Sequence, residues 1–184
     1  LGWSLATSFA GANWTLNPNV IGKSGASTQC AEFDNCNLNQ LASQEDMISK
    51  VIDLSGTTNP QVFFDVAYIP YTGYFDSLEV RLANGCGGTF GSLVYKKGGV
   101  TLQTDSTGNM NACWAPTLGS HWRTDSASLA AFAGSAVRVM FRNINRYGNF
   151  LFLDNINIQS TSPVGITSIL DSPRMFGLDP NPTS

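Results

Sequence analysis

Four aromatic residues stand close together in one short stretch: Tyr68, Tyr71, Tyr74 and Phe75. A proline and a glycine lie among them, so the stretch is predicted to be a loop rather than a strand. Sugar faces stack on aromatic rings, and exposed apolar patches of this kind usually mark contacts. The loop is therefore a candidate ligand-binding site for a glycan or a partner protein. The alternative is that the rings pack over the end of the folded domain.

A polar segment supplies the second candidate chemistry. Asp34 and Asn35 lie between Glu32 and Asn37. Carboxylate and amide oxygens are the ligands that Ca²⁺ prefers in proteins, so the segment predicts a structural calcium site. The alternative is that Asp34 and Asn35 form an Asx turn without any metal.

The four cysteines fall as two local pairs, Cys30 with Cys36 and Cys86 with Cys113. The single histidine, His121, lies outside any Cys-x-x-Cys pattern, which argues against a zinc site. We expect two disulfides formed in an oxidising compartment, with free buried thiols as the alternative. Four cysteines allow three connectivities, and the sequence does not choose among them.

Residues that could perform catalysis are scarce. A Ser-His-Asp arrangement needs a histidine oriented by a carboxylate, whereas His121 stands beside Trp122 before a predicted strand and is expected to be a turn or surface residue. The sequence has no His-Glu-x-x-His zinc motif, and no pair of its carboxylates stands out as a glycosidase pair. We expect a protein that is not an enzyme.

Composition limits the remaining functional classes. The length of 184 residues suits one domain with a sizeable core. The net charge is −3 and no basic stripe is present, which argues against a nucleic-acid partner. No apolar run approaches the roughly 18 residues that a membrane span needs. Hydrophobic residues make up 42% and charged residues 12%, and the abundance of glycine favours strands joined by tight turns.

Alternating apolar residues predict strands along most of the chain. Val137, Val139 and Phe141 point one way while the residues between them point the other, as expected for a sheet with one buried face. One short helical turn is predicted at residues 128–134. Many short strands in a chain of this size indicate an all-β fold, an antiparallel β-sandwich with jelly-roll topology. The strands are predicted at residues 14–16, 29–33, 47–54, 62–69, 77–82, 92–96, 122–129, 136–143 and 150–158.

The last residues differ from the rest of the chain. Residues 178–184 contain a Pro-Asn-Pro sequence, which can neither extend a helix nor lie inside a sheet. A segment rich in Ser, Thr and Pro precedes it. We therefore divide the chain into a sandwich domain at residues 1–159 and a linker with a C-terminal segment at residues 160–184. Spacing alone is also compatible with a frayed terminus.

Four groups of residues carry a resemblance to a known family: residues 46–55; 62–68; 75–80 with 86–89; and 122–124 with 139–145 and 153–156. In this order they resemble a jelly-roll module of secreted Bacteroidetes proteins. That module often follows metallopeptidase domains and is related to cleaved-adhesin and MAM-like sandwiches. The resemblance extends over residues 45–159.

The resemblance implies further site residues. Related jelly rolls hold a structural calcium between an early loop and the last strand, which adds Asp46 and Asp154 to Asp34 and Asn35 as candidate ligands. Cys113 is an addition to the family pattern and suggests a local disulfide with Cys86. Ser77, Ser106 and Ser126 each follow an aspartate, and the three triplets resemble the O-glycan acceptors of exported Bacteroidetes proteins.

The tail resembles the opening of the C-terminal sorting domain used for type IX secretion. This resemblance implies a secreted or outer-membrane-surface protein that meets the type IX machinery. The favoured function is a non-catalytic module for adhesion, binding a surface glycan or a protein. One alternative is a subunit that self-assembles into filaments or surface layers as a homo-oligomer, using the partly apolar residues 164–176 as an added strand. Another is an accessory domain of a secreted metallopeptidase.

Overall fold

The computed structural model describes residues 2–85 and 87–160. These residues form strands that are joined by loops and by three short 3-10 helices, η1 (Gly99–Thr101), η2 (Gly119–His121) and η3 (Ala130–Phe132). The strands are β1 (Trp3–Thr7), β2 (Thr15–Ile21), β3 (Ser27–Phe33), β4 (Gln44–Ser49), β5 (Ile52–Asp53), β6 (Pro60–Ala67), β7 (Ser77–Asn84), β8 (Ser92–Gly98), β9 (Arg123–Ser128), β10 (Ala136–Ile144) and β11 (Leu151–Ser160).

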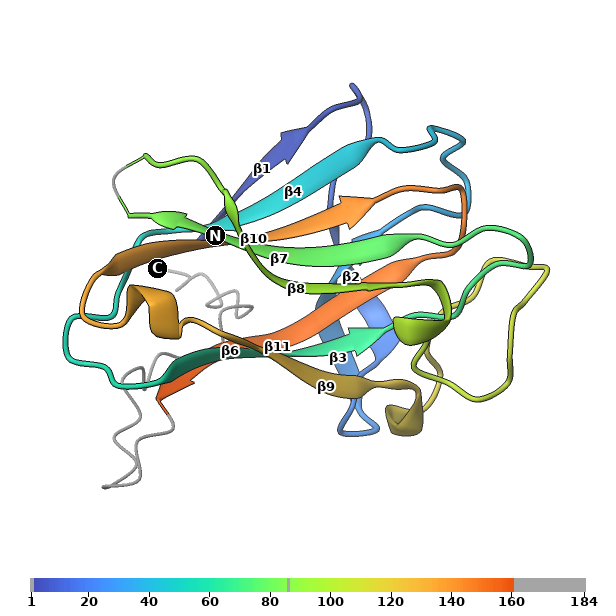
Figure 1. Cartoon of the computed structure of the whole chain (residues 1–184). Coiled ribbons are helices and arrows are strands. Elements are labelled where there is room, and N and C mark those ends of the chain that lie inside the picture. The colour runs from blue at the N-terminus through green and yellow to red at the C-terminus, as the bar shows by residue number, and fades with distance from the viewer. Residues whose placement is uncertain (1, 86, 161–184) are drawn as a thin grey trace, which may run out of the picture.

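Two antiparallel sheets pack face to face as a β-sandwich (Figure 1). Sheet A has the strand order β1-β4-β10-β7-β8, with β5 pairing β10 beyond the end of β4. Sheet B has the order β2-β3-β11-β6-β9. The predicted all-β fold with jelly-roll topology is confirmed. Within the described ranges, no helix has the length and apolar character needed to cross a bilayer.

The core lies between the sheets and follows the predicted alternation. Val137, Val139 and Phe141 of β10 are almost fully buried, and so are Val62 and Phe64 of β6 on the opposite sheet. The rings of Phe64 and Phe141 meet edge to face with centroids 5.1 Å apart. Because every second residue of a strand points to the same face, these runs join the two layers along their length.

A second apolar cluster lies on the outer face of sheet B. Cys30 of β3, Ala67 of β6 and Phe152 of β11 belong to it, together with Val20 and Trp122. Trp114 and Phe150 pack against it. The long connection between β8 and β9 therefore covers part of this sheet instead of leaving it open to solvent.

A charged cluster links the two sheets where β8 faces β9. The Asp125 carboxylate accepts hydrogen bonds from Tyr95 Oη at 2.6 Å, from Lys97 Nζ at 3.0 Å and from Arg123 at 2.9 Å. Burial alone would raise the pKa of Asp125, but these donors outweigh it and hold the pKa below its ordinary value. The cluster fastens the edge strand of one layer to the edge strand of the other.

The structure departs from the predicted strands in two places. The segment 47–54 forms two strands, β4 and β5, because the chain leaves the ladder at Lys50 and Val51. Strand β1 was not predicted at all. The other predicted strands and the helical turn are present with shifted ends. Since β11 continues to Ser160 and residues 161–184 lie outside the described residues, the division at 159/160 stays a prediction.

The sequence leaves the disulfide connectivity open, and the structure shows that the grouping of the cysteines into two local pairs is wrong. Cys36 is bonded to Cys113, a partner 77 residues away in sequence, with Cα atoms 5.7 Å apart. Cys30 is a free, buried thiol, and burial, reinforced by the charges of Asp154 and Glu32, raises its pKa to about 12. Cys30 lies within β3, in the apolar cluster on the outer face of sheet B, whereas Cys36 lies in the loop beyond the end of β3, where it is bonded to Cys113.

The suggested bond between Cys86 and Cys113 is excluded because Cys113 is already bonded. Strand β7 also carries the chain toward the other end of the sandwich. Its first residue, Ser77, pairs with Ile144 at the end of β10, and its last residue, Asn84, pairs with Val137 near the start of β10. Cys86 itself lies outside the described residues.

Candidate functional site

Three tyrosines and the disulfide line a groove of about 380 Å³ at one end of the sandwich. We call it the tyrosine groove, and its residues are Tyr71, Tyr74, Tyr147, Ala112, Cys36 and Cys113. The Tyr74 ring lies between the other two, with centroids 6.1 Å from Tyr71 and 5.5 Å from Tyr147. Four loops contribute to it, so the site exists only when the whole sandwich has formed.

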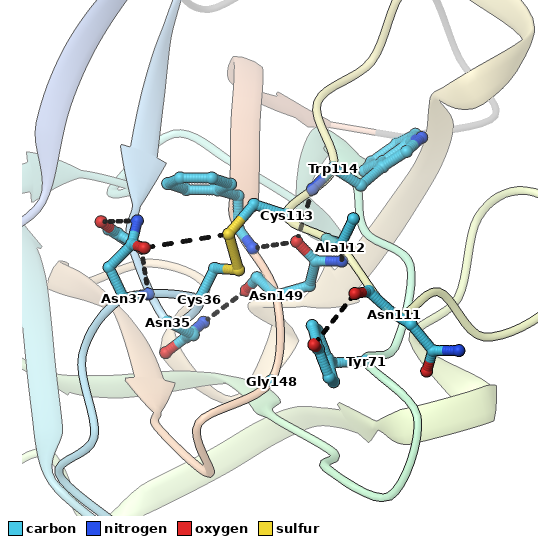
Figure 2. Close-up of a disulfide and its surroundings, with 12 residues drawn as sticks. Asn35, Cys36, Asn37, Tyr71, Asn111, Ala112, Cys113, Trp114, Gly148 and Asn149 are labelled. Atoms are coloured by element: carbon cyan, nitrogen blue, oxygen red, sulfur yellow. Dashed lines mark hydrogen bonds between the residues drawn. A yellow bond between two sulfur atoms is a disulfide. The ribbon is translucent and has the colours of Figure 1, made fainter.

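A tight turn presents Tyr71 and Tyr74 on the same side. The Tyr74 N–H donates to the Tyr71 carbonyl at 2.9 Å, and Gly73, with φ of 84°, supplies the positive φ that such a turn requires. A short parallel bridge to Met110 holds the turn against the β8–β9 connection. The Tyr71 hydroxyl adds a hydrogen bond to the Asn111 carbonyl at 3.0 Å (Figure 2).

A buried carboxylate organises the loop that carries Tyr147. Asp76 has no exposed surface, and its oxygens accept the backbone N–H groups of Arg146 at 2.8 Å, Gly148 at 3.2 Å and Asn149 at 2.8 Å. Burial raises the pKa of Asp76, and these hydrogen bonds oppose the shift. Tyr147 adopts φ of 59°, a conformation that costs a non-glycine residue energy and persists because its neighbours are fixed.

Gly148 fits this arrangement for a steric reason. A Cβ atom added to Gly148 would collide with the Asp76 carboxylate. The Tyr-Gly-Asn sequence is thus matched to Asp76, and together they set the position of the Tyr147 ring.

Three asparagines fix the segments on both sides of the disulfide, and Figure 2 shows two of them, Asn35 and Asn149. Asn35 and Asn143 exchange amide hydrogen bonds of 3.1 and 2.8 Å, and the Asn35 amide also donates to the Asn149 carbonyl at 3.1 Å. The Asn149 side chain accepts the Trp114 N–H at 2.8 Å and donates to the Ala112 carbonyl at 3.3 Å. The floor of the groove is therefore held by hydrogen bonds as well as by the covalent bond.

The groove offers aromatic faces and hydroxyl groups rather than reactive groups. Within residues 2–85 and 87–160, the hydroxyls of Tyr74 and Tyr147 bond to no other protein group, so both can bond to a ligand. Tyr74 is 41% exposed. Such a surface can stack on an apolar ring face and hydrogen-bond at its edge, the two interactions that saccharide recognition needs.

Two of the four predicted aromatic residues line the groove and two do not. Tyr71 and Tyr74 line the groove. Tyr68 is fully buried, and its hydroxyl bonds to Asp76, so its inclusion among the ligand-binding residues is wrong. Phe75 is 44% exposed but does not line the groove, and it packs beside the backbone of Gly99. Tyr147 was missed, because the sequence around it indicated only a turn.

The four candidate calcium ligands do not form one cage. Asp34 accepts the backbone and side-chain amide N–H groups of Asn37, three residues on, and the Asn35 amide is used in the network described above. Asp46 pairs with Arg142 on the outer face of sheet A, whereas Asp154 bonds Thr28 on the outer face of sheet B. The described part of the chain has no group of three or more His, Cys, Asp or Glu that could hold a metal. Calcium binding stays an untested prediction.

The candidate glycan acceptors differ in exposure. Ser106 is exposed in a turn in which Asp105 accepts the Thr107 N–H at 2.7 Å. Ser126 is exposed on edge strand β9, and Ser77 is half-buried in β7 opposite Gly98. Modification of any of the three is a prediction that only the chemistry of the purified protein can test.

His121 is bound on both ring nitrogens. Nδ1 accepts the Thr117 N–H at 3.1 Å, and Nε2 lies 3.3 Å from Asp105, while the ring packs against Trp114. The histidine thus holds the β8–β9 connection in place, and it lies in the 3-10 turn before β9, as predicted.

No protein-family model and no curated protein matches the chain. Solved structures do match. The K1 cleaved adhesin domain of Lys-gingipain from Porphyromonas gingivalis aligns with a TM-score of 0.60 and 18% identity, covering 88% of this chain and 92% of that one. The K3 domain of the same protein gives a TM-score of 0.56 at 15% identity, with 85% and 89% covered.

Carbohydrate-binding modules also share the fold. A structure of such modules from the β-sandwich superfamily has a TM-score of 0.50 at 9% identity, covering 85% of this chain and 56% of that one. At these identities the likeness concerns the fold: the chain has the β-sandwich architecture found in cleaved adhesin domains and in carbohydrate-binding modules.

Proposed function

We propose that this protein is a non-catalytic binding module of the cell surface that takes a saccharide in the tyrosine groove. The observation that carries the proposal is the rigid setting of three tyrosine rings around one cavity. Two of their hydroxyls form no hydrogen bond to any of the described residues, and a buried carboxylate fixes the loop that carries Tyr147. Structures of the same fold described as adhesin domains and carbohydrate-binding modules support this class of function.

The proposal is tested by removing one ring. Tyr74→Ala removes the central ring, and Phe75→Ala is the matched control because Phe75 is equally exposed next to the groove without lining it. We expect Tyr74→Ala to weaken binding of neutral tri- and tetrasaccharides about tenfold, as loss of a central aromatic contact does. Phe75→Ala should bind like the unaltered protein. Equal affinities of both variants, or stronger loss in Phe75→Ala, would refute the groove as the site.

We further propose that the protein is cargo of the type IX secretion system. The support is the Pro-Asn-Pro tail at residues 178–184, which lies outside the described residues. In a host that lacks a working type IX translocon, the protein should disappear from the cell surface and collect in the periplasm. Unchanged surface labelling in that host would contradict this route.

Neither alternative has an observation in its favour among the described residues. Self-assembly relied on residues 164–176, which lie outside them. The role of accessory domain to a metallopeptidase concerns a partner domain for which residues 2–85 and 87–160 offer no evidence.

A further inference from the structure

The tyrosine groove is surrounded by four loops, and each loop meets the next one at a boundary. The β6–β7 loop supplies Tyr71 and Tyr74, the β8–β9 connection supplies Ala112 and Cys113, the β3–β4 loop supplies Cys36, and the β10–β11 loop supplies Tyr147. A chain-like ligand that crossed the groove would have to pass over two of the four boundaries. The contacts at these boundaries therefore decide whether a saccharide can bind along its length or only by one end.

The first boundary, between the β6–β7 loop and the β8–β9 connection, is closed by hydrogen bonds. The Thr72 N–H donates to the Met110 carbonyl at 2.8 Å, and the Met110 N–H donates to the Pro70 carbonyl at 3.0 Å. The Tyr71 hydroxyl donates to the carbonyl of Asn111, which is an exposed residue (Figure 2). Since Tyr71 itself lines the groove, these bonds form part of the wall.

Two more boundaries are closed by residues that line the groove themselves. The bond between Cys36 and Cys113 joins the β3–β4 loop to the β8–β9 connection, and Cys113 is exposed, so the disulfide is part of the wall (Figure 2). The rings of Tyr74 and Tyr147 join the β6–β7 loop to the β10–β11 loop, with centroids 5.5 Å apart. Three of the four sides of the groove are thus walled.

The fourth boundary, between the β3–β4 loop and the β10–β11 loop, is joined at a deeper level. The Asn35 amide donates to the Asn149 carbonyl at 3.1 Å, and the Asn145 amide donates to the Leu38 carbonyl at 2.9 Å. The three asparagines have no exposed surface, so these bonds lie beneath the groove and do not raise a wall beside it. A ligand chain can leave over this side, but it has no second side over which to continue.

The tyrosine rings also do not form a flat platform. The plane of Tyr74 is tilted by 64° from that of Tyr71 and by 77° from that of Tyr147. Coplanar rings would suit successive units of a flat glycan, whereas tilted rings can contact one sugar ring from more than one side. The volume of about 380 Å³ is near the lower end of the range of small-molecule sites, which is about 300–1,000 Å³. The space therefore suits the end of a chain.

We propose that the tyrosine groove binds the terminal unit of a neutral saccharide chain, and that the rest of the chain leaves over the fourth boundary. This inference rests on the proposed function, because it assumes that the ligand is a saccharide. It adds that the ligand is recognised by its end. Such a module attaches once to each chain whatever the length of the chain, so branched glycans with many ends offer it more sites than long linear ones.

The probes are cello-, xylo- and malto-oligosaccharides of three and six units, titrated into the protein by calorimetry. In a series that binds, the dissociation constants of the two lengths should agree within about twofold, because the inner units stay outside the groove. Two modified six-unit chains locate the end: borohydride reduction opens the ring at the reducing end, and 4-O-methylation enlarges the unit at the other end. One of these changes should weaken binding about tenfold, and the other should leave it unchanged.

The variants separate this inference from the function on which it rests. Tyr74→Ala should weaken binding of both chain lengths by the same factor, and Phe75→Ala should bind both like the unaltered protein. Several-fold tighter binding of the six-unit chain, or equal binding of both modified chains and the unmodified one, would overturn end recognition while the groove stays the site. If no member of the three series binds the unaltered protein, the proposed function fails and this inference fails with it.

Discussion

The two ends of this sandwich are built in different ways. At the tyrosine groove, four loops are fixed by a disulfide, a buried carboxylate and an asparagine network. At the opposite end, the chain passes from β4 to β5, and among the residues that the structure describes Lys50 and Arg138 form no ion pair with a carboxylate. A surface built from linked loops can select a ligand by shape. Changes to the internal links should therefore damage the groove and spare the opposite end.

Replacement of Asp76 is expected to cause the largest loss of stability. Asp76→Ala leaves three backbone N–H groups, two of them buried, and the Tyr68 hydroxyl without their acceptor, so we expect a loss of about 3–5 kcal/mol in the free energy of unfolding. Urea denaturation measures it. Asp34→Ala is the matched control, because its carboxylate serves a single exposed turn, and it should cost about 1 kcal/mol or less.

The milder Asp76→Asn keeps one carbonyl acceptor and covers the case in which Asp76→Ala fails to fold. It should lower stability by less, while the Tyr147 signals shift and those of Trp3 stay in place. Equal disturbance of both ends would contradict the contrast between them.

Removal of the disulfide is expected to cause the second-largest loss of stability. Cys36→Ser with Cys113→Ser opens a link between residues 77 positions apart, and disulfides that close loops of this size usually add about 2–4 kcal/mol. We expect a lower melting temperature and weaker binding of neutral saccharides, with the NMR signals of Trp3 at the opposite end unchanged.

The pairing itself can be checked by alkylation of the denatured, unreduced protein followed by peptide mass analysis. Cys30 should be alkylated, and the peptides of Cys36 and Cys113 should remain joined. A protected Cys30 would contradict the structure.

The smallest expected effect is the pH dependence of stability that arises from two carboxylates, Asp76 and Asp53, one at each end of the sandwich. Burial raises the pKa of Asp76, so its contribution to stability is fully present below its unfolded pKa and is lost as pH rises through its folded pKa. The Ser55 backbone N–H lowers the pKa of Asp53, so its contribution is present above its unfolded pKa and is lost as pH falls through its folded pKa.

Carboxyl ¹³C titration by NMR should therefore show Asp76 protonating at higher pH than Asp53. In Asp53→Asn, the free energy of unfolding should fall slightly less steeply as the pH is lowered into the acid range. The reverse order of the two pKa values would contradict this assignment of the two environments.

Much of the fold can be predicted from the sequence, because the alternation of apolar and polar residues along a strand indicates which residues are buried. Val137, Val139 and Phe141 alternate in the sequence and are buried in the structure. Strand β1 escaped prediction for the opposite reason: it is an edge strand whose residues are mostly exposed, so no alternation marks it. Residues 47–54 are predicted as one strand although they belong to β4 and β5, because a break in hydrogen bonding leaves no sign in hydrophobicity.

The site was only partly readable because it depends on where loops meet. The clustered Tyr71 and Tyr74 gave a correct location, but nothing in the sequence joined them to Tyr147 or brought Cys36 to Cys113. Asp76 was read as part of a glycan acceptor, since an aspartate before a strand carries no sign of burial. The Asp76 carboxylate leaves no room for a Cβ atom at Gly148. This steric relation depends on the three-dimensional arrangement and cannot be inferred from the sequence.

A neutral saccharide bound in the tyrosine groove would be seen by backbone and side-chain chemical-shift mapping with a neutral oligosaccharide. We expect the largest shifts on Tyr71, Tyr74, Tyr147 and the segment around Cys113, with Trp3 unmoved. Shifts centred on the outer face of sheet B or on the end of the sandwich that carries Trp3 and Lys50, with the three tyrosines unshifted, would contradict binding in the groove.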